Sequence, residues 1–203
     1  TILTITPDSP GYSPDPVPYW SFKQIAEAAL ATPYPGSENE AIIALDNLLR
    51  DAVKHQMLSD VPLGASLSGG IDSSTIVALM QAQSNVPIKT FSIGFYEQAY
   101  NEARYAKEIA DYLGTDHTEL YVTAEEAMKV IPRLPGLYDE PFADSSQIPT
   151  HLVATLARQK VTVILSGDAG DELFGGYNRY FWGCGIWNKI GWIPRPLRFA
   201  GAG

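Results

Sequence analysis

The sequence predicts an α/β fold, a doubly wound and mostly parallel sheet with helices on both of its faces. Short apolar runs rich in β-branched residues alternate with helical patterns from residue 39 onward. The first run, residues 63–67, stops at a Ser-Gly-Gly turn that opens directly into a helical pattern. The last run, residues 161–165, also ends in a loop of glycine and acidic residues. Strands that lead one after another into helices are typical of parallel sheets.

After one leading helix, the elements are expected in strand-to-helix order. The expected strands are residues 63–67, 88–93, 117–122 and 161–165, and the expected helices are residues 39–58, 72–82, 102–113, 123–131 and 148–159. Gly114 closes one helix, whereas Thr123 and Glu126 form a capping box at the start of the next. Pro132 ends that helix, and residues 132–147 are expected to form a loop.

Three parts are expected along the chain: a linker or arm at 1–37, a main domain at 38–180 and an aromatic tail at 181–203. Frequent prolines in the first part favour an extended segment. The chain starts without Met and ends in Gly-Ala-Gly, so we expect it to be a piece of a longer protein. We expect the tail to pack against a further C-terminal portion, with a homodimer as the alternative.

Composition excludes several classes of function. A net charge of −9 over 203 residues argues against general binding to nucleic acid or to an anionic membrane. The single cysteine, Cys184, cannot form an internal disulfide, which fits a reducing, cytoplasmic environment, and we interpret it as a structural thiol. No apolar run approaches the roughly 20 residues that span a bilayer. No cluster of His and Cys has the spacing of a zinc site.

The stretch Ser68-Gly69-Gly70-Ile71-Asp72-Ser73-Ser74 is the strongest candidate site. A strand that turns into a helix here presents free backbone N–H groups and the positive end of a helix dipole, which together bind anions. The glycines let a ligand approach the backbone, and the serines add hydroxyl groups. Asp72 would repel phosphate unless Mg²⁺ lies between them. The stretch lacks the lysine of a Walker loop and resembles the pyrophosphate loop of ATP pyrophosphatases; the alternative is a structural Ser/Gly turn capped by Asp72.

A second candidate loop, residues 166–172, follows the last strand. Ligands of doubly wound sheets bind at the carboxyl ends of the strands, where strand order reverses. If the first and last strands are neighbours, Asp72 and Asp171 face each other there and suit Mg²⁺ together with phosphate oxygens. The alternative is an acidic surface loop. Ile93, before the Gly94 turn, is a candidate for an apolar adenine slot, with plain core packing as the alternative.

Five motifs carry a resemblance to a known family. They are VPLG before the first candidate loop, FSIGF at 91–95, NE at 101–102 through LGTDH at 113–117, DEPFADSS at 139–146 and LSGDAGDELFGGY at 165–177. In this order they resemble the synthetase domain of class B, glutamine-hydrolysing asparagine synthetase. The resemblance covers about residues 39–180 and implies a PP-loop fold like that of the adenine nucleotide alpha hydrolases.

The resemblance implies a reaction and its site residues. ATP activates the β-carboxylate of aspartate as β-aspartyl-AMP with release of pyrophosphate, and ammonia then displaces AMP to give asparagine. The implied nucleotide- and pyrophosphate-binding residues are Ser66, Ser68, Gly69, Gly70, Asp72, Ser73, Ser74, Ile93, Ser166 and Gly167. Asp72 and Asp171 are the implied Mg²⁺ ligands, and Asp168 is the implied catalytic residue, at a position where many members have Glu.

Some parts of such an enzyme are expected elsewhere. Ammonia would come from a glutaminase domain on the same parent chain, and the family's catalytic lysine is expected beyond residue 203. We therefore expect this piece alone to bind nucleotide but to be weakly active or inactive. Glu140 or Asp144 could pair with the ammonium of the amino-acid substrate; the alternative is that they cap a turn. His117, at the start of a strand, is interpreted as a hydrogen-bonded structural residue.

Two other functions fit the same motifs. The first is a related carboxyl-adenylating enzyme, an amide or β-lactam synthetase that acts on another acid. The second is a nucleotide-binding module without catalysis. Asp72 and Asp171 disfavour the second, because a module that only senses nucleotide does not need a site for Mg²⁺ and pyrophosphate.

Overall fold

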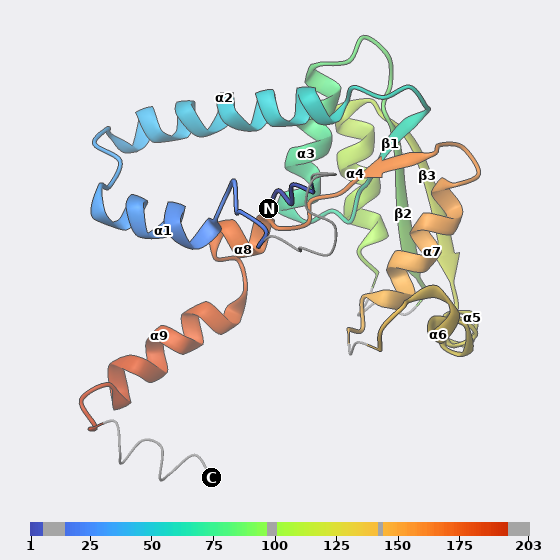
Figure 1. Cartoon of the computed structure of the whole chain (residues 1–203). Coiled ribbons are helices and arrows are strands. Elements are labelled where there is room, and N and C mark those ends of the chain that lie inside the picture. Colours follow the sequence, from blue (N-terminus) through green and yellow to red (C-terminus); the bar gives the residue numbers. More distant parts are fainter. Residues whose placement is uncertain (6–14, 97–100, 142–143, 195–203) are drawn as a thin grey trace. The chain divides into compact units, whose positions relative to one another are not determined.

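A computed structural model describes residues 1–5, 15–96, 101–141 and 144–194 (Figure 1). The chain divides into two units, residues 1–48 and residues 49–203, which are described separately. Among the described residues, no helix is both long enough and apolar enough to cross a membrane.

The first unit contains α1 (Phe22–Ala31) and the start of α2 (Glu38–Gln56). The Ser21 side chain caps α1 by accepting a hydrogen bond from the backbone N–H of Gln24. At the start of α2, Glu40 accepts hydrogen bonds of 2.8 Å from both the backbone N–H and the hydroxyl of Ser37. The prediction of an extended arm was therefore wrong for residues 22–31, where a capped helix forms between the prolines.

The second unit is built on a four-stranded parallel sheet in the order β3-β2-β1-β4. The strands are β1 (Leu63–Ser66), β2 (Lys89–Phe95), β3 (Asp116–Val122) and β4 (Val163–Leu165). Ala65 of β1 pairs with Leu165 of β4, so these two strands end side by side. The predicted doubly wound fold is confirmed, and strand order reverses between β1 and β4.

Helices cover both faces of this sheet (Figure 1). On one face, α3 (Ile71–Ala82), α4 (Ala103–Leu113) and the last turns of α2 enclose a core. The buried residues of that core are Val53, Ala65, Leu67, Val77, Leu79, Met80, Ile88, Ala106 and Ala110. On the other face, α7 (Gln147–Ala157) packs on β2, where Phe91 is buried with Leu156 and Ala157. Apolar residues on both sheet faces explain why the strands read as continuous apolar runs.

The segment between β3 and α7 differs from the prediction. The capping box at Thr123 and Glu126 is confirmed, with a 2.8 Å bond from the Thr123 N–H to the Glu126 carboxylate. However, α5 is short (Ala124–Met128), and a 3₁₀ helix (Ile131–Arg133) and α6 (Leu134–Leu137) occupy part of the expected loop. Proline lies in the first turn of both added helices, where its missing N–H costs no helical hydrogen bond.

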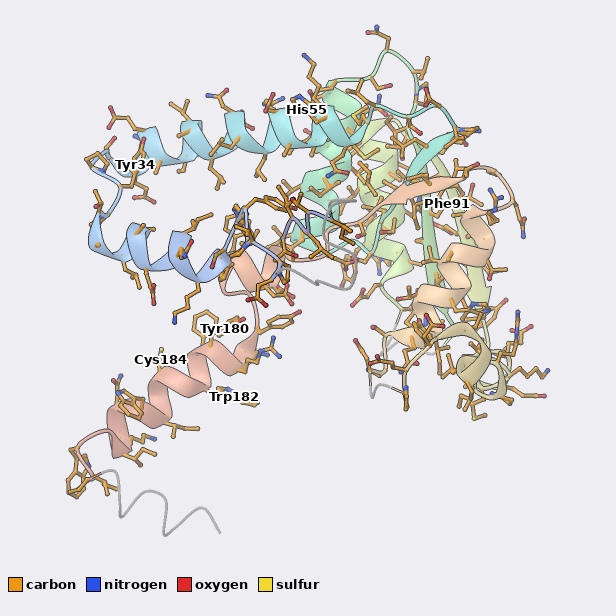
Figure 2. The ribbon with its side chains drawn as sticks, in the orientation of Figure 1. Tyr34, His55, Phe91, Tyr180, Trp182 and Cys184 are labelled. Carbon is orange, nitrogen blue, oxygen red and sulfur yellow. The ribbon has the colours of Figure 1, made fainter. Side chains whose placement is uncertain are left out.

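Two further helices lie in the C-terminal part, α8 (Gly170–Phe174) and α9 (Asn178–Ile190). Figure 2 shows Tyr180, Trp182 and Cys184 along α9, which has no buried residue. The sequence did not predict either helix, because α8 is very short and α9 has apolar residues on all sides instead of on one stripe.

A buried polar cluster joins β2 to β3. The ring Nδ1 of His117 lies 2.8 Å from the Thr90 hydroxyl, and Nε2 lies 3.2 Å from the Ser92 hydroxyl. A carboxylate oxygen of Glu119, 3.6 Å from Nε2, is buried without a hydrogen bond among the described residues. Burial lowers the pKa of His117, although the nearby Glu119 and Asp111 carboxylates raise it. The prediction that His117 is hydrogen-bonded is confirmed, and its structural role stays a prediction.

We predict that His117 makes the fold sensitive to acid. Its pKa is lower in the folded protein than in the unfolded chain, so the unfolded chain binds more protons as pH falls below about 6.5. Stability should therefore be complete above that pH and should decrease as pH falls toward the folded-state pKa. His117→Gln should flatten the dependence of the melting temperature on pH between about pH 7.5 and 5.5. His55→Gln, on an exposed residue, should keep the wild-type slope; equal slopes for His117→Gln and wild type would contradict the prediction.

Candidate functional site

The loop between β1 and α3 requires glycine at position 69. Gly69 has a φ of +83°, and a Cβ there would lie 2.7 Å from the Cβ of Tyr105 and 2.8 Å from the N of Ala106. Any larger residue would therefore collide with the first turn of α4. Glycine at this position lets the loop cross close to α4 and enter α3 directly.

The first turn of α3 is available to a ligand. Its N-cap, Gly70, offers no capping side chain, so the first backbone N–H groups have no partner within the helix. The hydroxyls nearby brace the loop: Ser73 Oγ lies 2.9 Å from Ser68 Oγ, and Ser74 Oγ donates to the Gly70 carbonyl at 2.6 Å. The structure thus shows these hydroxyls as internal supports, while the binding of an anion by the backbone N–H groups stays a prediction.

The loop after β4 lies against this seat. A Cβ on Gly167 would fall 2.6 Å from the backbone N of Ser73 and 2.8 Å from the carbonyl C of Asp72. Ser66 at the end of β1 donates a long 3.4 Å hydrogen bond to the Leu165 carbonyl, which ties the two strand ends together. The neighbouring strands therefore bring two loops, almost a hundred positions apart in sequence, into direct contact.

Asp72 and Asp171 line the same cavity, which has a volume of about 1200 Å³. Neither carboxylate makes a hydrogen bond or ion pair with another described residue. Gly170 leaves room for the Asp72 carboxylate, and Gly176 leaves room for that of Asp171, because a Cβ on either glycine would overlap it. The prediction that both residues face one switch point agrees with this placement. Their roles as metal ligands stay a prediction.

A magnesium ion fits this pair of carboxylates. Within the described ranges, no group of three or more His, Cys, Asp or Glu residues is placed to hold a metal by itself. Mg²⁺ commonly takes one or two carboxylates and completes its shell with substrate phosphates and water. Two unpaired carboxylates beside a helix N-terminus supply such a partial shell.

The larger cavity is strongly acidic. Its acidic lining residues are Asp72, Glu102, Asp144, Asp168, Asp171 and Glu172. None of the described residues that line it is Lys or Arg. A polyphosphate could therefore enter this cavity only with cations that screen the carboxylates.

Ser166 and Asp168, in the loop that follows β4, are joined by a hydrogen bond. The Ser166 hydroxyl donates to the Asp168 carboxylate at 2.8 Å, and both residues line the larger cavity with Gly167. The next residue, Ala169, has a φ of +74°, which is uncommon for a residue with a side chain. This turn directs Asp168 and Asp171 toward the same cavity.

A smaller cavity of about 520 Å³ adjoins the first. Phe91, Ile93, Phe95 and Val153 give it an apolar end. The predicted position of Ile93 at an apolar slot agrees with this lining, whereas the binding of adenine there stays a prediction. The slot lies between β2 and α7.

The structure separates the two predicted substrate residues. Asp144 lines the larger cavity, but Glu140 lines neither cavity. Asp144 also accepts a 2.8 Å hydrogen bond from the backbone N–H of Ser146, and this bond lowers its pKa. The alternative of a turn cap therefore describes Asp144 in this structure. Residues 142–143 of the same motif lie outside the described residues.

Some residues at the cavity were not singled out from the sequence. Tyr177 donates a 2.7 Å hydrogen bond to Glu172, which lowers the pKa of Glu172 and raises that of Tyr177. The Arg179 guanidinium lies 4.0 Å from the centre of the Tyr177 ring. Glu102, at the start of α4, lines both cavities. The motifs contain Glu102, Glu172 and Tyr177 but not Arg179, and no spacing rule indicated a role for any of them.

We predict that Gly167→Ala weakens anion binding at α3. The added methyl group would lie on the Ser73 N–H, so the first turn of α3 would have to shift or lose its access to a ligand. Affinity for inorganic pyrophosphate with Mg²⁺, measured by calorimetry, should fall at least about tenfold. Gly136→Ala is the control, because a Cβ there meets nothing within 4 Å, and it should bind like wild type. Wild-type affinity in Gly167→Ala would show that the seat lies elsewhere.

Comparisons with known proteins point to one family. A family model described as asparagine synthase matches residues 44–202. A protein of Methanocaldococcus jannaschii, provisionally named as a glutamine-hydrolysing asparagine synthetase, is 46% identical over 156 residues, which are 76% of this chain and 30% of that protein. Asparagine synthetase [glutamine-hydrolyzing] 1 of Bacillus subtilis is 42% identical over 148 residues, 73% of this chain and 23% of that protein.

The chain spans less than a third of the length of these relatives. Among solved structures, the NH3-dependent NAD synthetase of Campylobacter jejuni is similar at 14% identity and a TM-score of 0.47, over 66% of this chain and 60% of that chain. The family match extends over most of the sequence and includes both candidate loops. This chain belongs to the asparagine synthase family.

Proposed function

We propose that this chain is the ATP-using part of a protein that converts aspartate to asparagine, through β-aspartyl-AMP and with release of AMP and pyrophosphate. The observation that carries the proposal is the placement of Asp72 and Asp171 on one cavity beside the open N-terminus of α3. Family membership supports the reaction class, because the named relatives are asparagine synthetases.

ATP would lie across the two cavities. The smaller cavity, with Phe91 and Ile93 at its apolar end, suits the flat apolar faces of adenine. The phosphates would then reach the backbone N–H groups of residues 71–73 in the larger cavity. Gly167 and Ser166 would lie next to the α-phosphate, because their loop packs on the first turn of α3.

Asp72 and Asp171 would hold Mg²⁺ against the phosphate oxygens. The bound ion would neutralise charge on the departing pyrophosphate. The residues around it prepare this arrangement: Gly170 and Gly176 leave space for the two carboxylates, and α3 offers the positive end of its dipole to the same phosphates. Without a cation, six acidic residues would repel the nucleotide.

Asp168 would act as the general base in the second step of the reaction, the attack by ammonia. A carboxylate oxygen of aspartate first attacks the α-phosphorus, the bond to the β-phosphate oxygen breaks, and pyrophosphate leaves. Ammonia then attacks the acyl carbon of β-aspartyl-AMP, AMP leaves with the bonding electrons, and Asp168 accepts a proton from the incoming nitrogen. Ser166 orients the Asp168 carboxylate through its 2.8 Å hydrogen bond.

Other groups of the reaction would come from the rest of the parent protein. Ammonia would be supplied by a glutaminase domain on the same chain. The catalytic lysine expected beyond residue 203 agrees with the lining of the larger cavity, which has no basic side chain among its described residues. Such a lysine would give the developing negative charge a basic partner that the described lining of the larger cavity does not provide.

We predict that Asp72→Asn and Asp171→Asn each lower the affinity for Mg²⁺·ATP at least about tenfold, because each removes a charged ligand from the metal. Titration calorimetry at several Mg²⁺ concentrations measures this, and the loss should be smaller without Mg²⁺. Asp60→Asn, on an exposed turn outside both cavities, is the matched control. An Asp72→Asn variant with unchanged Mg²⁺·ATP affinity would favour a module without catalysis.

The acid substrate can be identified separately. The full-length parent protein should incorporate labelled pyrophosphate into ATP when aspartate is present, because the adenylation step is reversible and does not need ammonia. If labelled pyrophosphate entered ATP in the presence of another acid but not of aspartate, the protein would instead be a related amide or β-lactam synthetase. The 203-residue chain alone should bind nucleotide but exchange slowly or not at all.

A further inference from the structure

The two cavities share a short stretch of wall. The residues that line both are Ser66, Ser68, Glu102, Ser146 and Thr150. Glu102 is the charged member of this set. On one side of the shared wall lies the apolar slot formed by Phe91 and Ile93, and on the other side lies the acidic cavity that contains the α3 N-terminus. Any ligand that occupies both cavities must pass this point.

Glu102 is held firmly by its backbone but not by its side chain. It is the N-cap residue of α4, and its carbonyl accepts hydrogen bonds of 3.0 Å and 3.1 Å from the N–H groups of Tyr105 and Ala106. The adjacent Ala103 is almost fully buried, at 1% exposure, and the close approach of Gly69 fixes this turn to the β1–α3 loop. The Glu102 carboxylate is exposed and makes no hydrogen bond or ion pair with another described residue.

The proposed position of ATP assigns a chemical partner to this carboxylate. With adenine in the smaller cavity and phosphates at α3, the ribose is the part of the nucleotide that lies between them. Ribose offers two neighbouring hydroxyl donors, and the two oxygens of a carboxylate can accept from both. In other α/β folds an acidic residue accepts a hydrogen bond from the ribose 2′-hydroxyl of a dinucleotide. The serine and threonine hydroxyls of the shared wall are uncharged, so their bonds to a hydroxyl are weaker.

We infer that Glu102 binds the 2′- and 3′-hydroxyls of the ribose of ATP and thereby selects ribonucleotides over deoxyribonucleotides. This inference rests on the proposed function, because it requires ATP to occupy both cavities. The carboxylate acts at the sugar and is separate from the metal-binding pair, Asp72 and Asp171, which acts at the phosphates. The two ribose hydroxyls donate hydrogen bonds to the Glu102 carboxylate, which has no partner in the described part of the chain.

The test compares three nucleotides on three proteins. ATP, 2′-deoxy-ATP and 3′-deoxy-ATP, each with Mg²⁺, are titrated into wild type, Glu102→Ala and Glu108→Ala by calorimetry. Glu108 is the matched control because it is an exposed glutamate on the same helix that lines neither cavity, and its ion pair with Arg104 is a surface pair that contributes little to stability. Glu102 makes no side-chain capping bond, so alanine should not disturb α4.

Wild type and Glu108→Ala should bind ATP at least about tenfold more tightly than either deoxy analogue. Glu102→Ala should bind all three nucleotides with similar affinity, close to that of wild type for the deoxy analogues. If Glu102→Ala lost the same affinity for all three nucleotides, or kept the wild-type preference for ATP, the inference would be overturned. If wild type bound no Mg²⁺·ATP, or if Asp72→Asn bound it normally, the proposed function itself would fail, which is a different result.

Discussion

The site depends on the parallel pairing of β1 with β4. Because Ala65 is in register with Leu165, both strands end at the same level of the sheet, and the loops that follow them emerge together. The β1 loop supplies the N-terminus of α3 and Asp72, and the β4 loop supplies Asp168 and Asp171. Had β4 been added at the other edge, beside β3, these groups would be separated by two strands.

Charge then determines which ligand can occupy the cleft. Six acidic residues line the larger cavity and none of its described lining residues is basic, so electrostatics alone would exclude a polyphosphate. In the function that we propose, the α3 dipole and a cation held by the Asp72 and Asp171 carboxylates would reverse that preference locally. That arrangement would make nucleotide binding conditional on the metal, as expected for the proposed reaction, which releases pyrophosphate. The glycines at 167, 170 and 176 matter because side chains there would occupy the space of the helix end or the carboxylates.

The features predicted correctly from the sequence are those that local sequence patterns determine. Strand-to-helix alternation gave the fold, the Thr123 capping box was readable from spacing, and the switch-point rule placed Asp72 and Asp171 on one side of the sheet. It missed α1 and α6, where proline begins or flanks a helix instead of preventing one. It also could not separate Asp144 from Glu140 or find Glu102, because the lining of a cavity depends on tertiary contacts that no local pattern encodes.

The most direct measurement is the position of a metal ion in a crystal of this chain. Crystals grown with pyrophosphate and Mn²⁺, an anomalously scattering substitute for Mg²⁺, would locate the ion without assumptions about activity. We expect an anomalous peak within coordination distance of both the Asp72 and the Asp171 carboxylates, with pyrophosphate on the N–H groups of residues 71–73. A metal bound to neither carboxylate, or pyrophosphate bound away from α3, would contradict it.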